Sequence, residues 1–267
     1  FMTKLVLRMP KDNLFYSPKN PTRSLGYLKN LFGKIKQEGW TSDHLIQKTL
    51  DHIEDIKADP EFQYKKGEKK GELKQTGQQE IKRFEKTIQA SKLYDEYQKI
   101  LQEHSRYEFA DMILWVIDLL KKEEGILFDL QENFHFLLVD EMQDTNGTQL
   151  ELVNLLSNYD ASPNVFVVGD DDQAIYRFQG ANLDNLSDYR KKYIDNDLVE
   201  VSLKTNYRSY QGILNKATTL IENNKQRLIY QMPNLTKALE SFHTANSNKD
   251  SEPQIISNYN PHYEYAY

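Results

Sequence analysis

The stretch LLVDEMQDTNGTQLELVNLL, from Leu137 to Leu156, decides the fold class of this chain. Apolar residues lead into Asp140 and Glu141, a polar turn follows, and apolar residues then recur at helical spacing. The stretch therefore predicts a buried strand, a turn and a helix. Two adjacent carboxylates at the end of that strand are the feature to be explained.

Short apolar runs with helical patterns between them continue on the C-terminal side. The expected strands are FHFLLVD (134–140), NVFVVGD (164–170) and LVEVSL (198–203), and the expected helices are TQLELVNLLSNY (148–159) and SYQGILNKATTLIENN (209–224). This alternation predicts a parallel sheet covered on both faces. Before it, RYEFADMILWVIDLLKKEEG (106–125) predicts an apolar helix that ends at Gly125. The tail after about residue 231 predicts a loop, with QIISNYN (254–260) as one more strand.

The first hundred residues read as helices. Residues 24–39 and 41–56 predict two amphipathic helices, the first ending at Gly39, and residues 81–104 predict one long helix. The span 57–92 carries ten Lys and Arg against six Asp and Glu, an excess of four positive charges. Its polar part, 57–80, is either a solvated loop between helices or a DNA-facing edge of a helical subdomain.

Composition limits the function classes. The chain has no cysteine, which excludes disulfides and thiolate metal sites and permits a cytoplasmic location. The six histidines show no metal-ligand spacing. No signal peptide and no apolar run of about 18 residues is found, so no membrane partner is expected. With a net charge of −6 and pI near 5.6, any surface for nucleic acid must be locally basic.

Three polar clusters follow the expected strands. They are Asp140–Glu141, Gly169–Gln173 and Asn206–Ser209. Ligands of open parallel sheets lie beyond the carboxyl ends of the strands. We therefore expect all three clusters to line one crevice.

The first two clusters have side chains suited to nucleotide hydrolysis. A carboxylate such as Asp140 can hold the Mg²⁺ that bridges two phosphates, and the adjacent Glu141 can orient the attacking water. Gln173 can hydrogen-bond a γ-phosphate or that water. By itself, the first cluster is a weak signal, and a strand followed by a capping aspartate explains it better.

Aromatic and basic residues complete the pattern. Tyr176 and Phe178, with Arg177 between them, can stack on successive bases of single-stranded DNA; alternatively they belong to the core. Arg208 has the forked cation that suits a γ-phosphate, and Tyr207 can stack on adenine. By itself, this last pair is also compatible with an ordinary turn.

Taken together, LLVDEMQDTNGTQ, VFVVGDDDQAIYRFQGA and LKTNYRS resemble motifs II, III and IV of the superfamily 1 DNA helicases of the UvrD/Rep/PcrA type. RYEFADMILW also resembles the aromatic-Asp segment that precedes motif II there. The resemblance is strong over residues 105–212. It implies an α/β fold, with part of the parallel sheet of a RecA-like P-loop NTPase and a helical inserted subdomain.

The resemblance also implies a domain division. Residues 1–105 would form a mostly helical 1B-type insertion, 106–201 the later part of the first RecA-like domain, and 202–267 the start of the second. The P-loop pattern G-x-x-x-x-G-K-[ST] is absent, and GEKKGELKQTG (67–77) has the wrong spacing. We therefore expect an internal piece of a longer helicase, with motifs V and VI downstream, and little ATP turnover from this piece alone.

For the nucleotide site, the resemblance implies one role for each of five residues. Asp140 resembles the Walker B aspartate associated with Mg²⁺, and Glu141 the catalytic base, both reaching the metal largely through water. Gln173 resembles the γ-phosphate sensor. Arg208 resembles an arginine finger, and Tyr207 the residue that stacks on adenine.

For the DNA site, the resemblance implies that Tyr176, Arg177 and Phe178 contact single-stranded DNA. Gln143 and Asp144 would couple that site to the nucleotide site.

Three positions depart from the family pattern. Met142 stands where an aromatic residue is usual, Phe178 replaces a common Trp, and Gln179 replaces a common Arg. The last departure removes one expected contact with a phosphate or a base.

The implied function is that of an ATP-dependent DNA helicase, which moves along single-stranded DNA and unwinds duplexes in the 3′→5′ direction. Its cofactors would be ATP and Mg²⁺, and its partners single-stranded DNA and single-strand/duplex junctions. Two alternatives remain open: a subunit of a helicase–nuclease of the AddA/RecB type, or a non-catalytic DNA-binding module without a P-loop.

Overall fold

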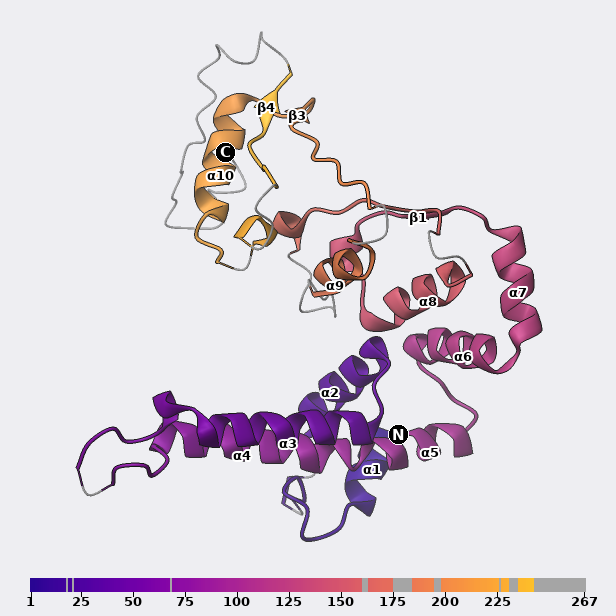
Figure 1. The fold of residues 1–267 in the computed structure, drawn as a ribbon. Helices are drawn as coiled ribbons and strands as arrows, with labels where there is room; N and C mark the ends of the chain where they lie inside the picture. Colours follow the sequence, from indigo (N-terminus) through magenta and orange to yellow (C-terminus); the bar gives the residue numbers. More distant parts are fainter. Residues whose placement is uncertain are drawn as a thin grey trace, which may run out of the picture. The chain divides into compact units, whose positions relative to one another are not determined.

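The computed structural model describes residues 1–17, 19–20, 22–67, 69–159, 163–174, 184–194, 198–225, 227–230 and 235–242 (Figure 1). The chain divides into two compact units, each with helices and a short parallel pair of strands. The first comprises Phe1–Val168 and Tyr176–Asn185, the second Gly169–Ile175 and Leu186–Tyr267. A mixed α/β fold is therefore confirmed.

Four helices of the first unit surround one apolar core. They are α1 (Met2–Arg8), α2 (Leu25–Glu38), α4 (Gln75–Ser91) and α5 (Tyr94–Glu103). Helix α2 is placed by its apolar stripe, from which Leu28, Phe32 and Ile35 are buried. It ends where the sequence predicts, because Gly39 takes the left-handed conformation, with φ of 66°, and its N–H caps the last carbonyls.

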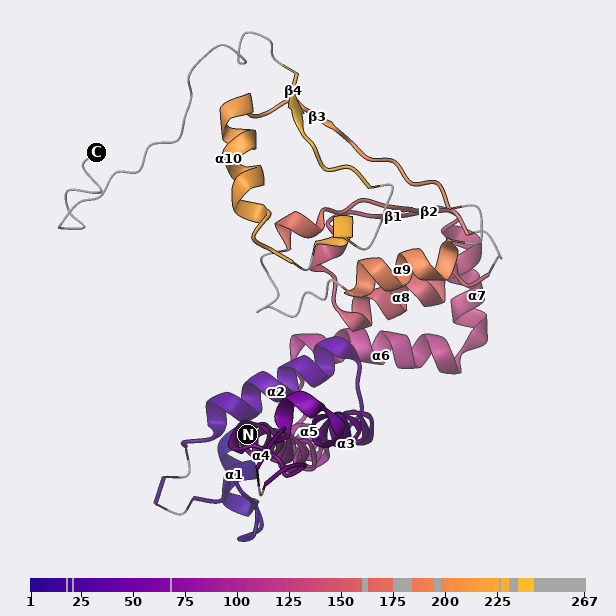
Figure 2. The ribbon, with the colours of Figure 1, turned by 60° about the vertical axis from the view of Figure 1, so that its left-hand side comes forward.

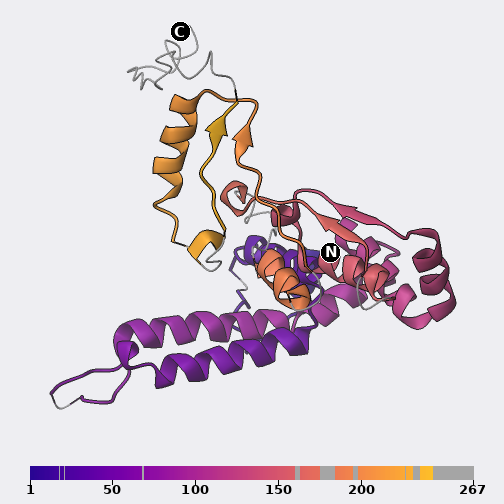
Figure 3. The ribbon, with the colours of Figure 1, turned by 45° about the horizontal axis from the view of Figure 1, so that its top comes forward.

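A helical hairpin extends from this core. Helix α3 (Ser42–Ala58) lies alongside α4, as Figures 1 and 3 show. Between them, a short turn η1 (Pro60–Phe62) leads into a two-stranded loop closed by a bridge between Gln63 and Leu73. The polar segment 57–80 thus contains a hydrogen-bonded loop between two helices.

The prediction of one helix over 81–104 is wrong. Helix α4 ends at Ser91, and α5 begins at Tyr94. The Ser91 hydroxyl bonds back to the Thr87 carbonyl at 2.8 Å, a contact that bends helices. The break also lets Tyr94 and Tyr97 pack against Phe32, with ring centroids 5.5 and 5.2 Å apart. Tertiary packing therefore overrides a continuous local pattern.

The prediction of a helix end at Gly125 is also wrong. Helix α6 (Phe109–Lys122) stops earlier, and Gly125 lies in the first turn of a further helix, α7 (Glu124–Asn133). The reason is local: Glu123 has φ of −110° and ψ of 80°, outside the helical region, and its N–H still bonds the Leu119 carbonyl.

A buried lysine joins α2 to α6. The Lys36 ammonium, with its side chain fully buried, donates to Asp111 at 2.8 Å and to Glu108 at 2.6 Å. Asp111 also accepts the backbone N–H of Glu108 and so closes the capping box of α6. The Tyr97 hydroxyl donates to Glu108 at 3.0 Å. Burial, together with that carboxylate, raises the pKa of Tyr97, which keeps the phenol a donor.

The predicted parallel sheet is present as one strand pair. Strand β1 (Leu137–Val139) pairs in parallel with β2 (Val165–Val167), and α8 (Gly147–Ser157) lies between them in sequence. Figure 2 shows α8 on one side of the pair. In the residues that the structure describes, the other side is open, since Leu138 is 75% and Phe166 63% exposed. The expectation of a sheet covered on both faces is therefore wrong for this part of the chain.

In the second unit, β3 (Thr205–Asn206) pairs in parallel with β4 (Glu240–Ser241) beside α10 (Gln211–Ile221). Two further elements are α9 (Asp184–Tyr193), which begins in the first unit, and the turn η5 (Leu228–Tyr230). The predicted strand over 198–203 does not form, because its apolar side chains find no cover: Val199, Val201 and Leu203 are all exposed. The strand predicted over 254–260 lies outside the described residues. Within the described segments, no helix has the length and apolar character needed to span a membrane.

The Lys36 contact predicts a large loss of stability on Lys36→Met. The substitution keeps the volume but leaves Asp111 buried without its cation, which costs about 3–5 kcal/mol. Urea denaturation at neutral pH measures this. Lys29→Met, at an exposed position of the same helix, is the matched control and should change little. Equal unfolding midpoints for the two variants would contradict the assigned role of Lys36.

Candidate functional site

The paired carboxylates lie directly after a parallel strand, as the sequence predicts. Asp140 is the first residue beyond β1, and one of its side-chain oxygens accepts the N–H of Glu141 at 2.9 Å. The N–H of Met142 then donates to the Val168 carbonyl at 2.9 Å and continues the pairing with the β2 segment. Both carboxylates are exposed, so the site has charged groups open to a ligand.

Glu141 has an unusual backbone. Its φ of 50° and ψ of 44° lie in the left-handed region, which costs a residue with a Cβ about 1–2 kcal/mol. Such strain is typical of functional sites, where the surroundings hold a side chain in a required direction. The reversal also removes the alternation of strand side chains, so that neighbouring residues can serve one site.

The turn after the pair is anchored by buried side chains. Met142 and Gln143 are buried, and the Gln143 amide donates to the Glu141 carboxylate. One oxygen of Asp144 is buried without a hydrogen-bond partner, an uncommon state for a carboxylate. The carbonyl of Thr145 accepts from Asn185 at 3.0 Å. Met142, which stands where the family pattern has an aromatic residue, thus still supplies a buried apolar side chain at this position.

The acidic turn, which we define as Gly169–Ala174, belongs to the second unit. Gln173 is exposed there, and its amide donates to Asp170 at 2.9 Å. The carboxylates of Asp170, Asp171 and Asp172 lie within 4.8 Å of one another, a grouping that could hold a metal ion. Lys237 already meets all three, at 2.9 Å from Asp170 and 3.3 Å from Asp172, with a direct contact to Asp171. Within the turn, the charge of the three carboxylates is thus partly compensated by a cation.

A second cation completes this cluster. Arg227 forms a two-bond ion pair with Asp172, Nε to Oδ1 and Nη2 to Oδ2, each at 2.8 Å. The next N–H, of Leu228, donates to Asp171 at 2.7 Å. Arg227 and Asp171 are both buried. Sequence reasoning missed Arg227 and Lys237, because they lie 55 to 67 residues from the turn and no local pattern connects them.

The charges of the cluster support one another. Burial alone would raise the pKa of Asp170, but hydrogen bonds from Lys237 and Gln173 outweigh it and hold this pKa below its usual value. Burial alone would lower the pKa of Lys237, but its hydrogen bonds to Asp171 and Asp170 raise it. Hydrogen bonding to Asp172 likewise raises the pKa of Arg227. These groups are therefore charged at neutral pH.

The third cluster forms a turn after β3. One Asn206 oxygen accepts the N–H groups of Arg208 and Ser209, at 2.9 and 2.7 Å, and so fixes the turn. Arg208 is exposed. Tyr207 is also exposed and packs against Phe242, with ring centroids 4.7 Å apart. The turn thus presents a cation and an aromatic ring to solvent.

The remaining predicted residues are not described. Tyr176, Arg177, Phe178 and Gln179 lie outside the described part of the chain. Asp140 and Glu141 lie in the first unit, whereas Gln173, Tyr207 and Arg208 lie in the second, so a shared crevice remains a prediction.

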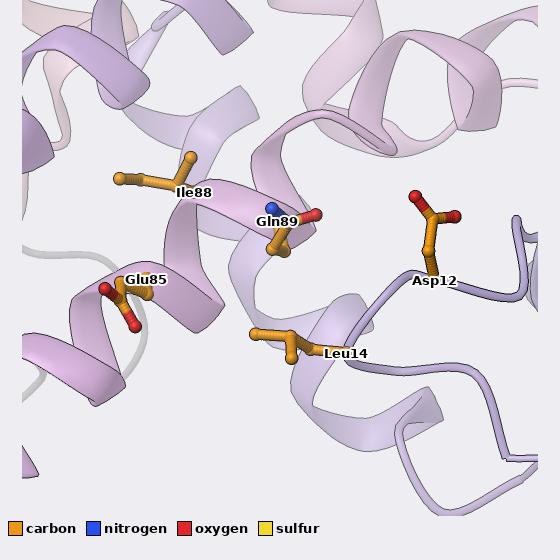
Figure 4. Close-up of a pocket in the computed structure, with 5 residues that line it drawn as sticks. All are labelled: Asp12, Leu14, Glu85, Ile88 and Gln89. Carbon is orange, nitrogen blue, oxygen red and sulfur yellow. The ribbon is translucent and has the colours of Figure 1, made fainter.

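An open hollow lies elsewhere, on the helical part (Figure 4). Its volume is about 300 Å³, and its lining residues are Asp12, Leu14, Glu85, Ile88 and Gln89. Two carboxylates and no cation line it, so it does not suit a phosphate. It does not include any predicted site residue.

The strained backbone predicts different stabilities for two substitutions that both remove the Glu141 carboxylate. Glu141→Gly relieves the left-handed strain, whereas Glu141→Ala keeps a Cβ. After the greater freedom of glycine in the unfolded chain is subtracted, the Gly variant should be about 0.5–1 kcal/mol more stable. Urea denaturation of both variants measures the difference. A more stable Ala variant would show that residue 141 is not left-handed.

Comparison with known proteins finds a matching family model and several similar DNA helicases. The family model for the UvrD/REP helicase N-terminal domain matches residues 9–194. The ATP-dependent DNA helicase PcrA of Leuconostoc citreum is 39% identical over 145 residues, which are 54% of this chain and 19% of that protein. DNA helicase II of Haemophilus influenzae is 38% identical over 137 residues, 51% of this chain and 18% of the relative. PcrA of Staphylococcus aureus is 38% identical over 135 residues, again 51% and 18%.

These matches cover about a fifth of the length of the curated relatives. The family match covers more than half of this chain and includes β1, the carboxylate pair, β2 and the acidic turn. The chain therefore belongs to the UvrD/REP helicase N-terminal domain family.

Proposed function

We propose that this chain is part of an ATP-dependent DNA helicase, which couples ATP hydrolysis to movement on single-stranded DNA and to duplex unwinding. The observation that carries the proposal is the exposed Asp140–Glu141 pair at the carboxyl end of a parallel strand, with Glu141 in a strained left-handed conformation. The names of the relatives, ATP-dependent DNA helicase PcrA and DNA helicase II, support it.

The donor set fits the proposed cofactors. Two exposed carboxylates suit Mg²⁺, a hard cation that prefers oxygen ligands and retains several waters. Asp140 would hold the metal of a Mg²⁺–ATP complex, which supplies charge neutralisation between the phosphates. Glu141 would accept a proton from the attacking water, and the hydrogen bond from Gln143 orients its carboxylate. Gln173 would contact the γ-phosphate, and Arg208 and Tyr207 the phosphate and the adenine.

The fold proposed for the longer protein is a RecA-like P-loop NTPase. The exposed apolar face of β1 and β2 supports it, since parallel sheets are normally covered on both faces. We propose that residues 106–201 supply the later part of a first RecA-like domain and 202–267 the start of a second. Residues 1–105 would form the inserted helical subdomain.

For DNA, we propose that Tyr176 and Phe178 stack on bases while Arg177 contacts the strand. The protein would move along this strand in the 3′→5′ direction. Gln143 and Asp144, which follow the carboxylate pair directly, would couple the DNA site to the nucleotide site. The buried, unpaired oxygen of Asp144 supports such a role, because the free energy that this oxygen costs needs a functional reason.

The first expected outcome concerns ATP hydrolysis. Full-length protein should hydrolyse ATP faster when single-stranded DNA is present, and Glu141→Gln should lower kcat by about 10²–10⁴-fold, the usual contribution of a general base. Binding of ATP and DNA should persist, because the substitution keeps the shape of the side chain and one oxygen that can accept from Gln143. A phosphate-release assay measures the rates.

Glu132→Gln is the matched control, since Glu132 is also exposed but lies before β1. It should leave the rate unchanged. Folded wild-type protein that binds DNA without any turnover would instead identify a non-catalytic DNA-binding module.

The second expected outcome concerns the basic loop between α3 and α4. Lys65, Lys66, Lys69 and Lys70 are exposed on it, and hydrogen bonds between Tyr64 and the segment 71–72 hold its shape. If the loop contacts duplex DNA, changing all four lysines to glutamine should reduce the slope of log K against log salt by about 0.9 for each lost phosphate contact. Fluorescence anisotropy with a tailed duplex at several salt concentrations measures the slope.

A control with the same net charge separates a local contact from a general effect. It changes four other exposed lysines of the first unit to glutamine: Lys11, Lys19, Lys29 and Lys34. Equal slopes for the two quadruple variants would mean that the loop is only solvated.

A further inference from the structure

The position of Gln173 depends on a chain of contacts. Its amide donates to Asp170, Asp170 accepts from Lys237, and Lys237 also meets Asp171 and Asp172. An ionised carboxylate can only accept hydrogen bonds, so Asp170 selects the nitrogen end of the Gln173 amide. The amide oxygen then remains as an acceptor for other groups, such as a water molecule.

The acidic turn has little apolar packing to hold it. Of the residues from Gly169 to Gln173, only Asp171 is buried, and that residue is itself charged. Within the turn, the Asp172 N–H bonds to Asp170 at 3.1 Å and the Gln173 N–H bonds to the Asp170 carbonyl at 2.9 Å. Without cations, three carboxylates so close together would repel one another. The conformation of the turn therefore requires compensating charge.

That charge comes from the segment after α10. The guanidinium of Arg227 donates two hydrogen bonds to the Asp172 carboxylate, and the N–H of the adjacent Leu228 donates one to Asp171. Lys237, only 14% exposed in its side chain, lies against all three carboxylates. The first unit thus includes the chain up to Val168, and the acidic turn that follows belongs to the second unit, as do Arg227 and Lys237.

We propose that Arg227 and Lys237 are positioning residues, which fix the acidic turn and thereby aim Gln173 at the γ-phosphate of bound nucleotide. This inference rests on the proposed function. It adds that the second unit, through two cations far away in sequence, sets the geometry of a residue in the nucleotide site. Arg227 and Lys237 do not themselves touch the nucleotide; they act through the turn.

The test uses full-length protein and a double-mutant cycle. Arg227→Gln should lower kcat for ATP hydrolysis by about 10- to 100-fold, the expected effect of a small misplacement of a group at the reaction centre. Affinity for ADP, which has no γ-phosphate, should stay the same. In Arg227→Gln combined with Gln173→Ala, kcat should be no lower than in Gln173→Ala alone, because the first residue acts through the second.

Two further variants keep the test decisive. Asp170→Asn lies on the more exposed side of the turn, keeps the side-chain shape and removes the charged acceptor of Gln173. If Arg227→Gln does not fold, Asp170→Asn takes its place in the double-mutant cycle with Gln173→Ala. Arg190→Gln is the matched control, since it breaks a more exposed ion pair with Glu200 in the same unit. It should leave kcat unchanged.

The outcomes separate the two proposals. Wild-type protein without DNA-stimulated turnover would overturn the proposed function, and this inference with it. If the wild type hydrolyses ATP, unchanged kcat in both Arg227→Gln and Asp170→Asn would overturn only the inference. The inference would also be overturned if the loss of kcat in Arg227→Gln added in full to the loss in Gln173→Ala, or if Arg227→Gln lowered the affinity for ADP as much as it lowered kcat. The positioning role would be established by a loss of kcat in Arg227→Gln with unchanged ADP affinity, if adding Arg227→Gln to Gln173→Ala causes no further loss of kcat.

Discussion

The parallel pairing of β1 with β2 is the constraint on which the candidate site depends. A parallel pair brings the carboxyl ends of both strands to one edge, so the loops that follow them start together. Two hydrogen bonds extend this pairing past the strands, from Val168 to the Val139 carbonyl and from Met142 to the Val168 carbonyl. They fix the points at which the carboxylate pair and the acidic turn leave the sheet.

The two loops are then held in different ways. After β1, burial of Met142 and Gln143 anchors the turn, and the left-handed backbone of Glu141 directs its carboxylate. After β2, ion pairs replace apolar packing, and the anchors are Arg227 and Lys237. These ion pairs are largely buried, so salt screens them only weakly. The acidic turn is therefore held by paired charges, whereas the turn after β1 is held by burial.

An ion-pair cluster around a buried lysine also organises the helical part. Lys36 joins α2 to the start of α6 through Asp111 and Glu108, and α6 leads through α7 to β1. The helical residues and the strand pair belong to one compact unit. A charged contact inside an apolar region tolerates little displacement, because an unpaired charge there is costly. This contact accordingly specifies one arrangement of the two helices.

The sequence by itself determined the parts that depend on local pattern. Alternating apolar runs and helices identified the parallel strands, Gly39 identified the end of α2, and the ordered motifs identified the family. Only the tertiary structure decided where the 81–104 helix breaks, that 198–203 forms no strand, and which cations compensate the acidic turn. Those outcomes depend on contacts between residues distant in sequence. A helix bends where aromatic rings must reach Phe32, an apolar run without cover does not become a strand, and Arg227 finds Asp172 only after the chain has folded.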